Sequence, residues 1–409
     1  MAEVKRCRSC HGSTLRPFLS LGSTPLADAL VAPGDWGGEE RFPLEVAFCV
    51  GCSLVQLLEE LPPQRLFVDN YLYFSSFSDD VQSHSSAHAE ELVTRRGLDG
   101  GDLVVEIASN DGYLLRHFAS RGVRVLGIDP APDQAAAAEA AGIPTLREFF
   151  GPEVAARLRH GGERAEVVIA KNVMAHVPDL NGFVAAMATL LADDGEIHVE
   201  NPYVVQLIAN REFDTIYHEH LCYFSCTAVA ALARRNGLWL NDVVEFPRLH
   251  GGTLRWVLGL HHRPSEAVGR FLEAEREGGV TAFDHYAGFA DEVARTSAEL
   301  RSVLTSLRSE GARIAGYGAA AKGSTLLNAV GIDTDLVSFV VDRNRHKHGL
   351  CMPGTHQPIR DPSALLEERP DYVLLLAWNF KEEIMLQQQP YLDGGGRFIV
   401  PVPSPQVVP

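Results

Sequence analysis

Two short cysteine motifs near the N-terminus limit what the first part of this chain can fold into. They are Cys7-Arg8-Ser9-Cys10 and Cys49-Val50-Gly51-Cys52. A gap of two residues lets both sulfurs of a pair face one ion, and four thiolates satisfy tetrahedral zinc. The spacing therefore predicts a closed, structural zinc site whose ligands are Cys7, Cys10, Cys49 and Cys52. Two unrelated reduced pairs, or a redox motif, are the alternatives.

The rest of the N-terminal segment fits a small module that needs such a site. Residues 1–68 contain short strand-like runs, at 44–48 and 54–57, among frequent prolines and glycines. A module of this size holds too small a core to fold without a staple. The chain has seven cysteines in 409 residues, an odd and sparse set that argues against a disulfide framework. We expect Cys222, Cys226 and Cys351 to be ordinary packing residues.

The net charge narrows the possible partners. Lys and Arg number 36 against 53 Asp and Glu, which gives a net charge of −17. An acidic chain without a basic cluster is a poor ligand for nucleic acid or for an anionic membrane surface. No apolar run is long enough for a transmembrane helix, and the start lacks the apolar core of a signal peptide. We therefore expect a cytoplasmic protein that binds neither nucleic acid nor membrane.

Beyond residue 68, strand-like and helix-like segments alternate. Strands are expected at 103–108, 124–129, 167–170 and 196–200, with helical patterns such as 132–141 and 182–191 between them. From residue 246 the rhythm restarts, with a strand at 253–260, a long helical stretch at 265–310, and strands at 313–316, 337–342 and 372–376. This alternation is typical of doubly wound parallel sheets. The sequence thus predicts an α/β protein of three parts, 1–68, 69–245 and 246–409.

The first strand of the middle part ends in a polar turn, Ser109-Asn110-Asp111-Gly112. Ligands of such sheets bind at the carboxyl ends of strands. Asp129 ends the next strand, where a carboxylate can accept hydrogen bonds from a ribose diol. Because the turn holds one glycine, the dinucleotide fingerprint G-x-G-x-x-G is absent. The oxygens of Asn110 and Asp111 favour a cationic cofactor, S-adenosylmethionine, over a dinucleotide.

Two further segments concentrate groups that can perform chemistry. One is Lys171–Pro178, which follows a strand, and the other is Tyr217-His218-Glu219-His220. A histidine can remove a carbon-bound proton that an adjacent ketone has acidified, and a tyrosine hydroxyl can donate to the resulting enolate oxygen. A glutamate beside them can orient an imidazole. The histidine spacing does not match a zinc protease, and a histidine-rich surface turn remains an alternative.

A second glycine turn, Gly316–Gly323, ends a strand of the C-terminal part and opens a helix. Its small residues let backbone amides approach a pyrophosphate, the helix dipole favours an anion, and Lys322 adds charge. A later strand ends in Asp342-Arg343, which suits a ribose or base contact. The chain therefore carries two nucleotide-type sites, one for a cofactor and one for a nucleotide-linked substrate. The segment Tyr71–Ser76 could line a substrate wall or pack between domains.

With these motifs in this order, the chain resembles the nucleotide-sugar C-methyltransferases of antibiotic deoxysugar pathways. The resemblance covers nearly the whole chain and rests on the two cysteine pairs, Tyr71–Ser76, Glu106–Gly112, Asn172–Val177, Tyr217–His220, Gly316–Gly323, Val341–Asn344 and Pro353–Thr355. It implies a zinc-binding module at 1–68, an S-adenosylmethionine Rossmann-like methyltransferase domain at 69–245, and a Rossmann-like sugar-nucleotide-binding domain at 246–409. It also implies methylation of a dTDP-linked 4-keto-deoxysugar, at C3 beside the ketone. Apart from the resemblance, we expect a monomer.

The resemblance assigns expected roles to individual residues. For catalysis these are His220 as general base, with Tyr217, Glu219 and His176 around the sugar. For the cofactor they are Glu106, Ala108, Asn110, Asp111, Gly112, Asp129 and Asn172. For the sugar nucleotide they are Tyr71, Tyr73, Ser75, Ser76, Tyr317, Gly318, Lys322, Asp342 and Arg343. Phe149 and Phe150 would lie near the adenine.

Three alternatives to this function stay open. One is C5 methylation of a related dTDP-4-keto sugar. Another is an NAD-dependent sugar-nucleotide oxidoreductase, which the missing G-x-G-x-x-G and Y-x-x-x-K patterns disfavour. The third is a zinc-containing binding protein without catalytic activity.

Overall fold

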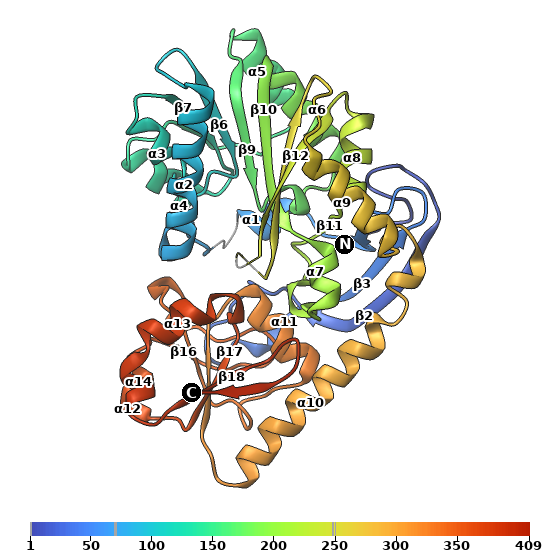
Figure 1. Ribbon diagram of the computed structural model, residues 1–409. Helices are drawn as coiled ribbons and strands as arrows, with labels where there is room; N and C mark the ends of the chain where they lie inside the picture. Colours follow the sequence, from blue (N-terminus) through green and yellow to red (C-terminus); the bar gives the residue numbers. More distant parts are fainter. Residues whose placement is uncertain (1, 69–71, 248, 250) are drawn as a thin grey trace.

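The computed structural model describes residues 2–68, 72–247, 249 and 251–409. It contains an antiparallel zinc-module sheet, a large middle sheet and a C-terminal sheet (Figure 1). The middle and C-terminal sheets face each other, and the zinc-module strands lie at their junction. None of the described helices is both long and apolar enough to cross a lipid bilayer.

The zinc module is a four-stranded antiparallel sheet of order β11-β4-β3-β2. Three strands come from the N-terminal segment, β2 (Leu15–Pro25), β3 (Arg41–Cys49) and β4 (Val55–Leu57). The fourth, β11 (Cys222–Tyr223), comes from the middle part of the chain and pairs with β4 through Gln56 and Val55. A two-stranded ribbon of β1 (Ala2–Glu3) and β5 (Glu59–Glu60) and the short helix α1 (Pro63–Phe67) complete the described part of this module.

The middle sheet has seven strands in the order β12-β13-β10-β9-β6-β7-β8. They are β6 (Leu103–Ile107), β7 (Arg124–Ile128), β8 (Thr145–Leu146), β9 (Ala165–Lys171), β10 (Leu191–Pro202), β12 (Trp239–Phe246) and β13 (Thr253–Gly259). Five of them, from β10 to β8, run parallel, and β13 is antiparallel to both of its neighbours. The predicted doubly wound sheet is therefore present, with an antiparallel edge.

The strand at 253–260 corrects one prediction. The sequence placed it at the start of the C-terminal βαβ unit, but β13 lies between β10 and β12 of the middle sheet. Every residue of β13 is buried. A short, fully buried strand has no polar alternation to show which sheet it joins. The middle sheet thus extends past residue 246, where the sequence placed a domain boundary.

Helices cover both faces of the middle sheet because successive side chains of each strand point to opposite faces. Val104 of β6 packs into one core cluster with α2 (Asp79–Arg96), α3 (Leu115–Ala119) and α4 (Pro132–Ala140). Val105 packs into the other, with α5 (Pro152–His160), α6 (Leu180–Leu190) and α8 (Cys226–Arg235). Ser78, Asp179 and Ser225 cap the N-termini of α2, α6 and α8 with their side-chain oxygens.

The predicted helical stretch at 265–310 consists of two helices, α9 (Glu266–Glu277) and α10 (Phe289–Ser309). Gly278 and Gly279 end α9, and the second of these has a left-handed φ of +72°. α10 passes the outer edge of the zinc module on its way to the C-terminal sheet (Figure 1). Phe289 at its start contacts Phe18 of β2, with ring centroids 6.2 Å apart.

The C-terminal sheet has six strands in the order β16-β15-β14-β17-β18-β19. They are β14 (Ile314–Tyr317), β15 (Val340–Val341), β16 (Ile359–Arg360), β17 (Tyr372–Leu375), β18 (Arg397–Val400) and β19 (Gln406–Val408), the last antiparallel. Its helices are α11 (Ala321–Val330), α12 (Ala364–Glu368), α13 (Lys381–Gln387) and α14 (Gln389–Asp393), and α7 (Val204–Ala209) follows β10 of the middle sheet. The strand-turn-helix unit β14–α11 holds the second predicted glycine turn, and it opens toward the middle sheet.

Candidate active site and zinc site

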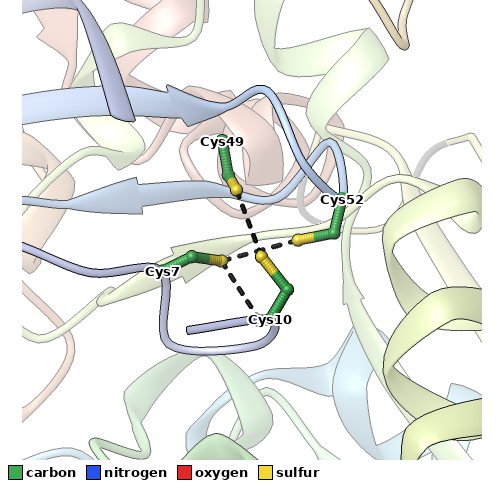
Figure 2. Close-up of side chains that lie close together, drawn as sticks. All are labelled: Cys7, Cys10, Cys49 and Cys52. Carbon is green, nitrogen blue, oxygen red and sulfur yellow. Dashed lines mark hydrogen bonds between the residues drawn. The ribbon is translucent and has the colours of Figure 1, made fainter. Parts of the chain in front are cut away.

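The four predicted cysteines form one cluster (Figure 2). All four Sγ atoms lie within 4.8 Å of one another, and the Cys7–Cys52 and Cys10–Cys49 pairs are each 3.5 Å apart. Zinc–sulfur bonds of about 2.3 Å in a tetrahedron place sulfurs about 3.8 Å apart, so the cluster fits the ion. All four positions are thiolate ligands, which leaves no open coordination position for chemistry.

The backbone around the two cysteine pairs repeats the same turn. The amides of His11 and Ser53 donate to the carbonyls of Cys7 and Cys49, each at 2.9 Å. Both residues have left-handed φ values, +59° and +61°. These turns aim both sulfurs of each pair at the same point.

The zinc site is fixed to the middle part of the chain. The side-chain amide of Asn181, on α6, donates to the carbonyls of Arg8 and Ser9 at 2.9 Å. Arg235, at the end of α8, donates to the hydroxyl of Ser9 at 2.8 Å. The first cysteine turn is therefore held from outside by two helices that cover the middle sheet.

A cavity of about 580 Å³ lies at the carboxyl ends of β6, β7, β9 and β10. This size is typical of a ligand site. All three parts of the chain line it. The zinc module contributes Asp28, Gln64 and Phe67, and the C-terminal part contributes Ala320, Ala321, Lys322, Lys347, Ala377, Asn379 and Phe380. The middle part contributes most of the predicted residues, namely Tyr73, Ser75, Ala108, Asn110, Asp129, Asn172, His176, Tyr217, Glu219 and His220.

Asp129 is held at one end of the cavity by its neighbours. One carboxylate oxygen accepts the amide of Asn110 at 2.8 Å, and the other accepts the amide of Ala131 at 2.9 Å. Burial raises the pKa of Asp129 to about 6, and the two amide hydrogen bonds oppose the rise. Phe149 and Phe150 line the same region. A carboxylate beside an aromatic pair suits a ribose joined to a base.

The turn after β6 has an unusual backbone. Ala108 and Asn110 have φ values of +55° and +50°, as does Asn172 after β9 at +50°. Such conformations in non-glycine residues cluster at functional sites, because surrounding structure must enforce them. The side chain of Asn110 accepts the amide of Ser75 at 2.9 Å and donates to the carbonyl of Tyr73 at 3.1 Å. Asn110 thus holds the predicted substrate segment against the cofactor turn.

Two buried polar groups of the cavity lining form no hydrogen bond with the described residues. They are the ammonium of Lys171 and the side-chain oxygen of Asn172. Lys171 forms an ion pair with Glu200 at 3.5 Å. Burial raises the pKa of Glu106, with Lys171 opposing the rise. A cationic donor and an acceptor, adjacent in sequence at one end of the cavity, suit a ligand that carries both charges. Glu106, Asp111 and Gly112 themselves lie behind the lining.

The hydrogen bonds of His220 fix the tautomer of its ring. Nδ1 lies 2.8 Å from the carbonyl of Thr215, so this nitrogen must be the donor. Nε2 is then the basic nitrogen, and it accepts the hydroxyl of Tyr217 at 2.9 Å. The backbone at 213–215 therefore orients His220 as a base in the cavity, with the hydroxyl of Tyr217 already hydrogen-bonded to its Nε2 atom.

His176 and Glu219 lie beside this pair. Nδ1 of His176 donates to the backbone carbonyl of Glu219 at 2.6 Å, and the rings of His176 and His220 are 4.9 Å apart. Burial lowers the pKa of His176, which keeps its ring neutral. Burial, followed by the nearby Asp28 carboxylate, raises the pKa of Glu219 to about 8. The structure thus brings all four predicted catalytic residues to one wall of the cavity.

The second glycine turn contributes fewer lining residues than predicted. Lys322 lines the cavity, and its ammonium lies 4.4 Å from the centre of the Trp378 ring. Tyr317, Gly318, Asp342 and Arg343 are not among the lining residues. The carboxylate of Asp342 accepts the amides of Ala319 and Asn344, each at 2.7 Å, so it supports the turn. Ser76 also lies outside the lining, and Tyr71 lies outside the described residues.

Several lining residues were not predicted from the sequence. Asp28 lies in a turn and Lys347 ends a short 3-10 helix, neither of them in a chemical motif, and Phe67 and Asn379 are isolated in sequence. Thr215 acts through its backbone carbonyl, which any residue type would supply. Lys171 also lines the cavity, and the sequence did point to it, because it begins a predicted segment at the end of a buried strand, where ligands bind.

Comparison with known proteins now identifies the class. Three family models match in succession, a zinc binding domain at 7–67, a methyltransferase domain at 81–242 and a C-methyltransferase C-terminal domain at 248–403. The protein is an S-adenosylmethionine-dependent methyltransferase with a zinc-binding module. An oxidoreductase or a non-catalytic binding protein does not fit these matches.

Individual relatives narrow the class to a family. The chain is 38% identical to the C-methyltransferase NovU of Streptomyces niveus, over 99% of this chain and 97% of that protein. It is 33% identical to a ubiquinone biosynthesis O-methyltransferase of a Methylobacterium strain, over 23% of this chain and 39% of that protein. The magnesium protoporphyrin IX methyltransferase of Synechocystis aligns with a TM-score of 0.35 and 15% identity, covering 48% of this chain and 88% of that one. The chain belongs to the C-methyltransferase family that includes NovU.

We predict that the purified protein contains about one zinc ion per chain and that Cys49→Ser removes it. Loss of the ion should also loosen residues 217–223, because β11 pairs with β4 of the zinc module. Elemental analysis and hydrogen–deuterium exchange of this segment measure the two effects. Cys351→Ser is the matched control, since this buried cysteine lies outside the cluster. A folded protein free of metal would refute the site.

Proposed function

We propose that this C-methyltransferase acts on a dTDP-linked 4-keto-deoxysugar and methylates C3, next to the C4 ketone. The observation that carries the proposal is the pairing of a base with a proton donor, His220 and Tyr217, on the wall that faces the second glycine turn. A carbon can be methylated this way only when its proton is acidic, and a neighbouring ketone supplies that acidity. The resemblance of the whole chain to deoxysugar C-methyltransferases supports the sugar.

In the proposed mechanism, rotation of the Tyr217 hydroxyl frees His220 to act as the base and makes Tyr217 the hydrogen-bond donor to the substrate. In the described state the hydroxyl of Tyr217 occupies the basic nitrogen of His220. When a ketone oxygen enters, this hydroxyl turns to it, and Nε2 of His220 becomes free to accept the carbon-bound proton. The enolate oxygen is then held by the phenol. When bound, S-adenosylmethionine would supply its methyl group to the enolate carbon; the carbon–sulfur bond would break and the ketone would form again.

Local positive charge supports an anionic substrate at the C-terminal side of the cavity. Lys322 and Lys347 line that side, and Ala320 and Ala321 lie at the N-terminus of α11, where unpaired amides and the helix dipole favour an anion. Burial lowers the pKa of Lys322, and the carboxylates of Asp214 and Glu212 oppose this effect. A nucleoside diphosphate is an anion that this wall would attract.

The opposite end suits S-adenosylmethionine. We assign the ribose to Asp129, the adenine to Phe149 and Phe150, and the methionine end to Lys171 and Asn172. Lys171 would meet the methionine carboxylate, and the side-chain oxygen of Asn172 would meet the ammonium. Bound in this way, the cofactor supplies the electrophilic methyl group to the carbon that His220 deprotonates.

His220→Asn should reduce methyl transfer by at least about 10²-fold, because a general base commonly contributes 10²–10⁴-fold. The substitution keeps a hydrogen-bonding side chain, so binding of S-adenosylmethionine and of dTDP should remain. Single-turnover rates and calorimetric binding separate the two. His160→Asn is the matched control, since that exposed histidine on α5 donates to the carbonyl of Ala156 and does not line the cavity. Full activity of the His220 variant would contradict the assignment of His220 as the general base.

The substrate and the enolate are tested together with labelled S-adenosylmethionine and a panel of dTDP-4-keto sugars. We expect the label at C3 and loss of deuterium from that carbon to water before methylation, both followed by NMR. Label at C5 would assign the alternative position. Deuterium retained in the product would exclude the enolate, and no transfer to any 4-keto sugar would exclude the proposed substrate.

Lys171→Met should weaken S-adenosylmethionine about 10-fold, the size of one lost charge-assisted hydrogen bond. It should leave 5′-methylthioadenosine unaffected, because that analogue lacks the amino-acid end. Calorimetric titration of both ligands measures the difference and shows whether the variant is folded. Lys322→Met, on the other side of the cavity, should not change either affinity. Equal weakening of both ligands would contradict the assignment of Lys171.

A further inference from the structure

The C-terminal part of the chain contacts the turn that orients His220. This turn is the short 3-10 helix η4 (Phe213–Thr215) of the middle part, and all three of its residues are buried. The facing element is η7 (Trp378–Phe380), a second 3-10 helix that follows β17. The indole N–H of Trp378 donates to the carboxylate of Asp214 at 2.6 Å. Because a hydrogen bond to a charged group is among the stronger ones in proteins, this contact joins the two helices firmly.

The carboxylate of Asp214 needs this donor. Asp214 is 0% exposed, and its Oδ1 atom forms no hydrogen bond with the described residues, whereas its Oδ2 atom accepts the indole N–H. Burial raises the pKa of Asp214 to about 6, and the nearby Lys322, followed by the Trp378 hydrogen bond, opposes the rise. Loss of the N–H would leave a buried carboxylate poorly solvated, so the turn would have to move or Asp214 would have to bind a proton.

A movement of this turn reaches His220 through one residue. Thr215 follows Asp214 directly in sequence, and its carbonyl accepts the Nδ1–H of His220 at 2.8 Å. The amide and the hydroxyl of Thr215 both donate to the carbonyl of Glu212, at 3.0 and 2.7 Å, so these residues move together. The Thr215 carbonyl keeps the proton of the imidazole on Nδ1 and the lone pair on Nε2. The position of Asp214 therefore affects which nitrogen of His220 is basic.

The indole ring also contacts the wall that we assign to the anionic end of the substrate. The ammonium of Lys322 lies 4.4 Å from the centre of the Trp378 ring, within the range of a cation–π contact. Lys322 lines the cavity, whereas Trp378 is not among the lining residues. The same ring packs against the hydrophobic core of the C-terminal sheet. Trp378 thus connects a lysine of the cavity wall with the turn that orients the base.

We infer that Trp378 is a positioning residue for the reaction: through its hydrogen bond to Asp214, the C-terminal part of the chain holds the turn that fixes the tautomer of His220. This inference rests on the proposed function, in which His220 is the general base. Trp378 acts through Asp214 and Thr215 and transfers no proton. Without the hydrogen bond, His220 should spend part of its time with the proton on Nε2, where it cannot accept the carbon-bound proton.

The first measurement needs no substrate. The tautomer of His220 is read by ¹⁵N NMR in the zinc-loaded full chain at about pH 8, where imidazole rings are mostly neutral, and loss of the signal in His220→Asn assigns it. We expect an Nδ1–H ring in the unmodified protein and a mixture with the Nε2–H form in Trp378→Phe, which keeps an aromatic ring and removes the N–H. Asp214→Ala removes the acceptor and should give the same mixture. The double variant should show no further change, because both substitutions break one hydrogen bond.

Glu292→Gln is the matched control for looser docking. The carboxylate of Glu292, on α10, accepts Nε of Arg211 at 3.0 Å, so it joins the C-terminal part to the same segment of the middle part without contacting η4 through this bond. This variant should keep the Nδ1–H ring. An unchanged tautomer in both Trp378→Phe and Asp214→Ala, or an equal change in Glu292→Gln, overturns the inference.

Turnover gives the second measurement. Trp378→Phe keeps a ring beside Lys322, so the calorimetric affinity for dTDP should not change, while kcat should fall at least about 10-fold because the base holds the wrong tautomer part of the time. A loss of dTDP affinity with unchanged kcat would assign Trp378 to substrate binding and overturn the positioning role. A changed tautomer with no methylation of any 4-keto sugar would refute the proposed substrate and leave the positioning of His220 standing.

Discussion

The pairing of β11 with β4 is the contact on which the arrangement of the active site depends. β11 begins two residues after His220, and it completes a sheet whose other strands belong to the zinc module. The carbonyl of Leu221 accepts the amide of Leu57 at 2.9 Å, and His218 donates to the carbonyl of Pro43 at the same distance. The loop that carries Tyr217, Glu219 and His220 is thus attached to a module too small to hold its shape without the tetrathiolate site. The zinc ion does no chemistry, yet the geometry of the reacting groups rests on it.

The cofactor end depends on a different constraint, the burial of charge within the middle sheet. Glu200 of β10 lies between Arg255 at 2.7 Å, His84 at 2.9 Å and Lys171 at 3.5 Å. Burial alone would raise the pKa of Glu200, but the cations hold it well below its usual range. Breaking such a buried set would leave an uncompensated charge, so the network holds Lys171 at the end of β9. His84 lies on α2, which follows directly on the segment that Asn110 holds, so the same network ties that helix to the sheet.

What could be predicted from the sequence follows from how local each feature is. The cysteine pairs, the polar turn before Gly112 and the Tyr217–His220 segment each contain their chemistry within a few neighbouring residues, and the structure gathers their members into two sites. The strand at 253–260 was placed in the wrong sheet, because a fully buried strand has no polar alternation to mark its partner. Asp28 and Lys347 were missed because tertiary contacts bring them to the cavity. One such contact is the β-bridge of Val31 and Cys351, which joins residues far apart in sequence. Asp342 was predicted to face a ligand, and its carboxylate instead accepts two amides of its own domain.

The net charge of −17 does not show how charged side chains are distributed around the cavity. The cavity places Lys322 and Lys347 on the side of the second glycine turn, and Asp129 and Glu106 at or behind the side of the first. An anionic substrate and a cationic cofactor would therefore enter the same cavity from walls of opposite charge, with the reacting carbon between them. The zinc module lines this same cavity with Asp28, Gln64 and Phe67, which makes the module part of the active site as well as its support.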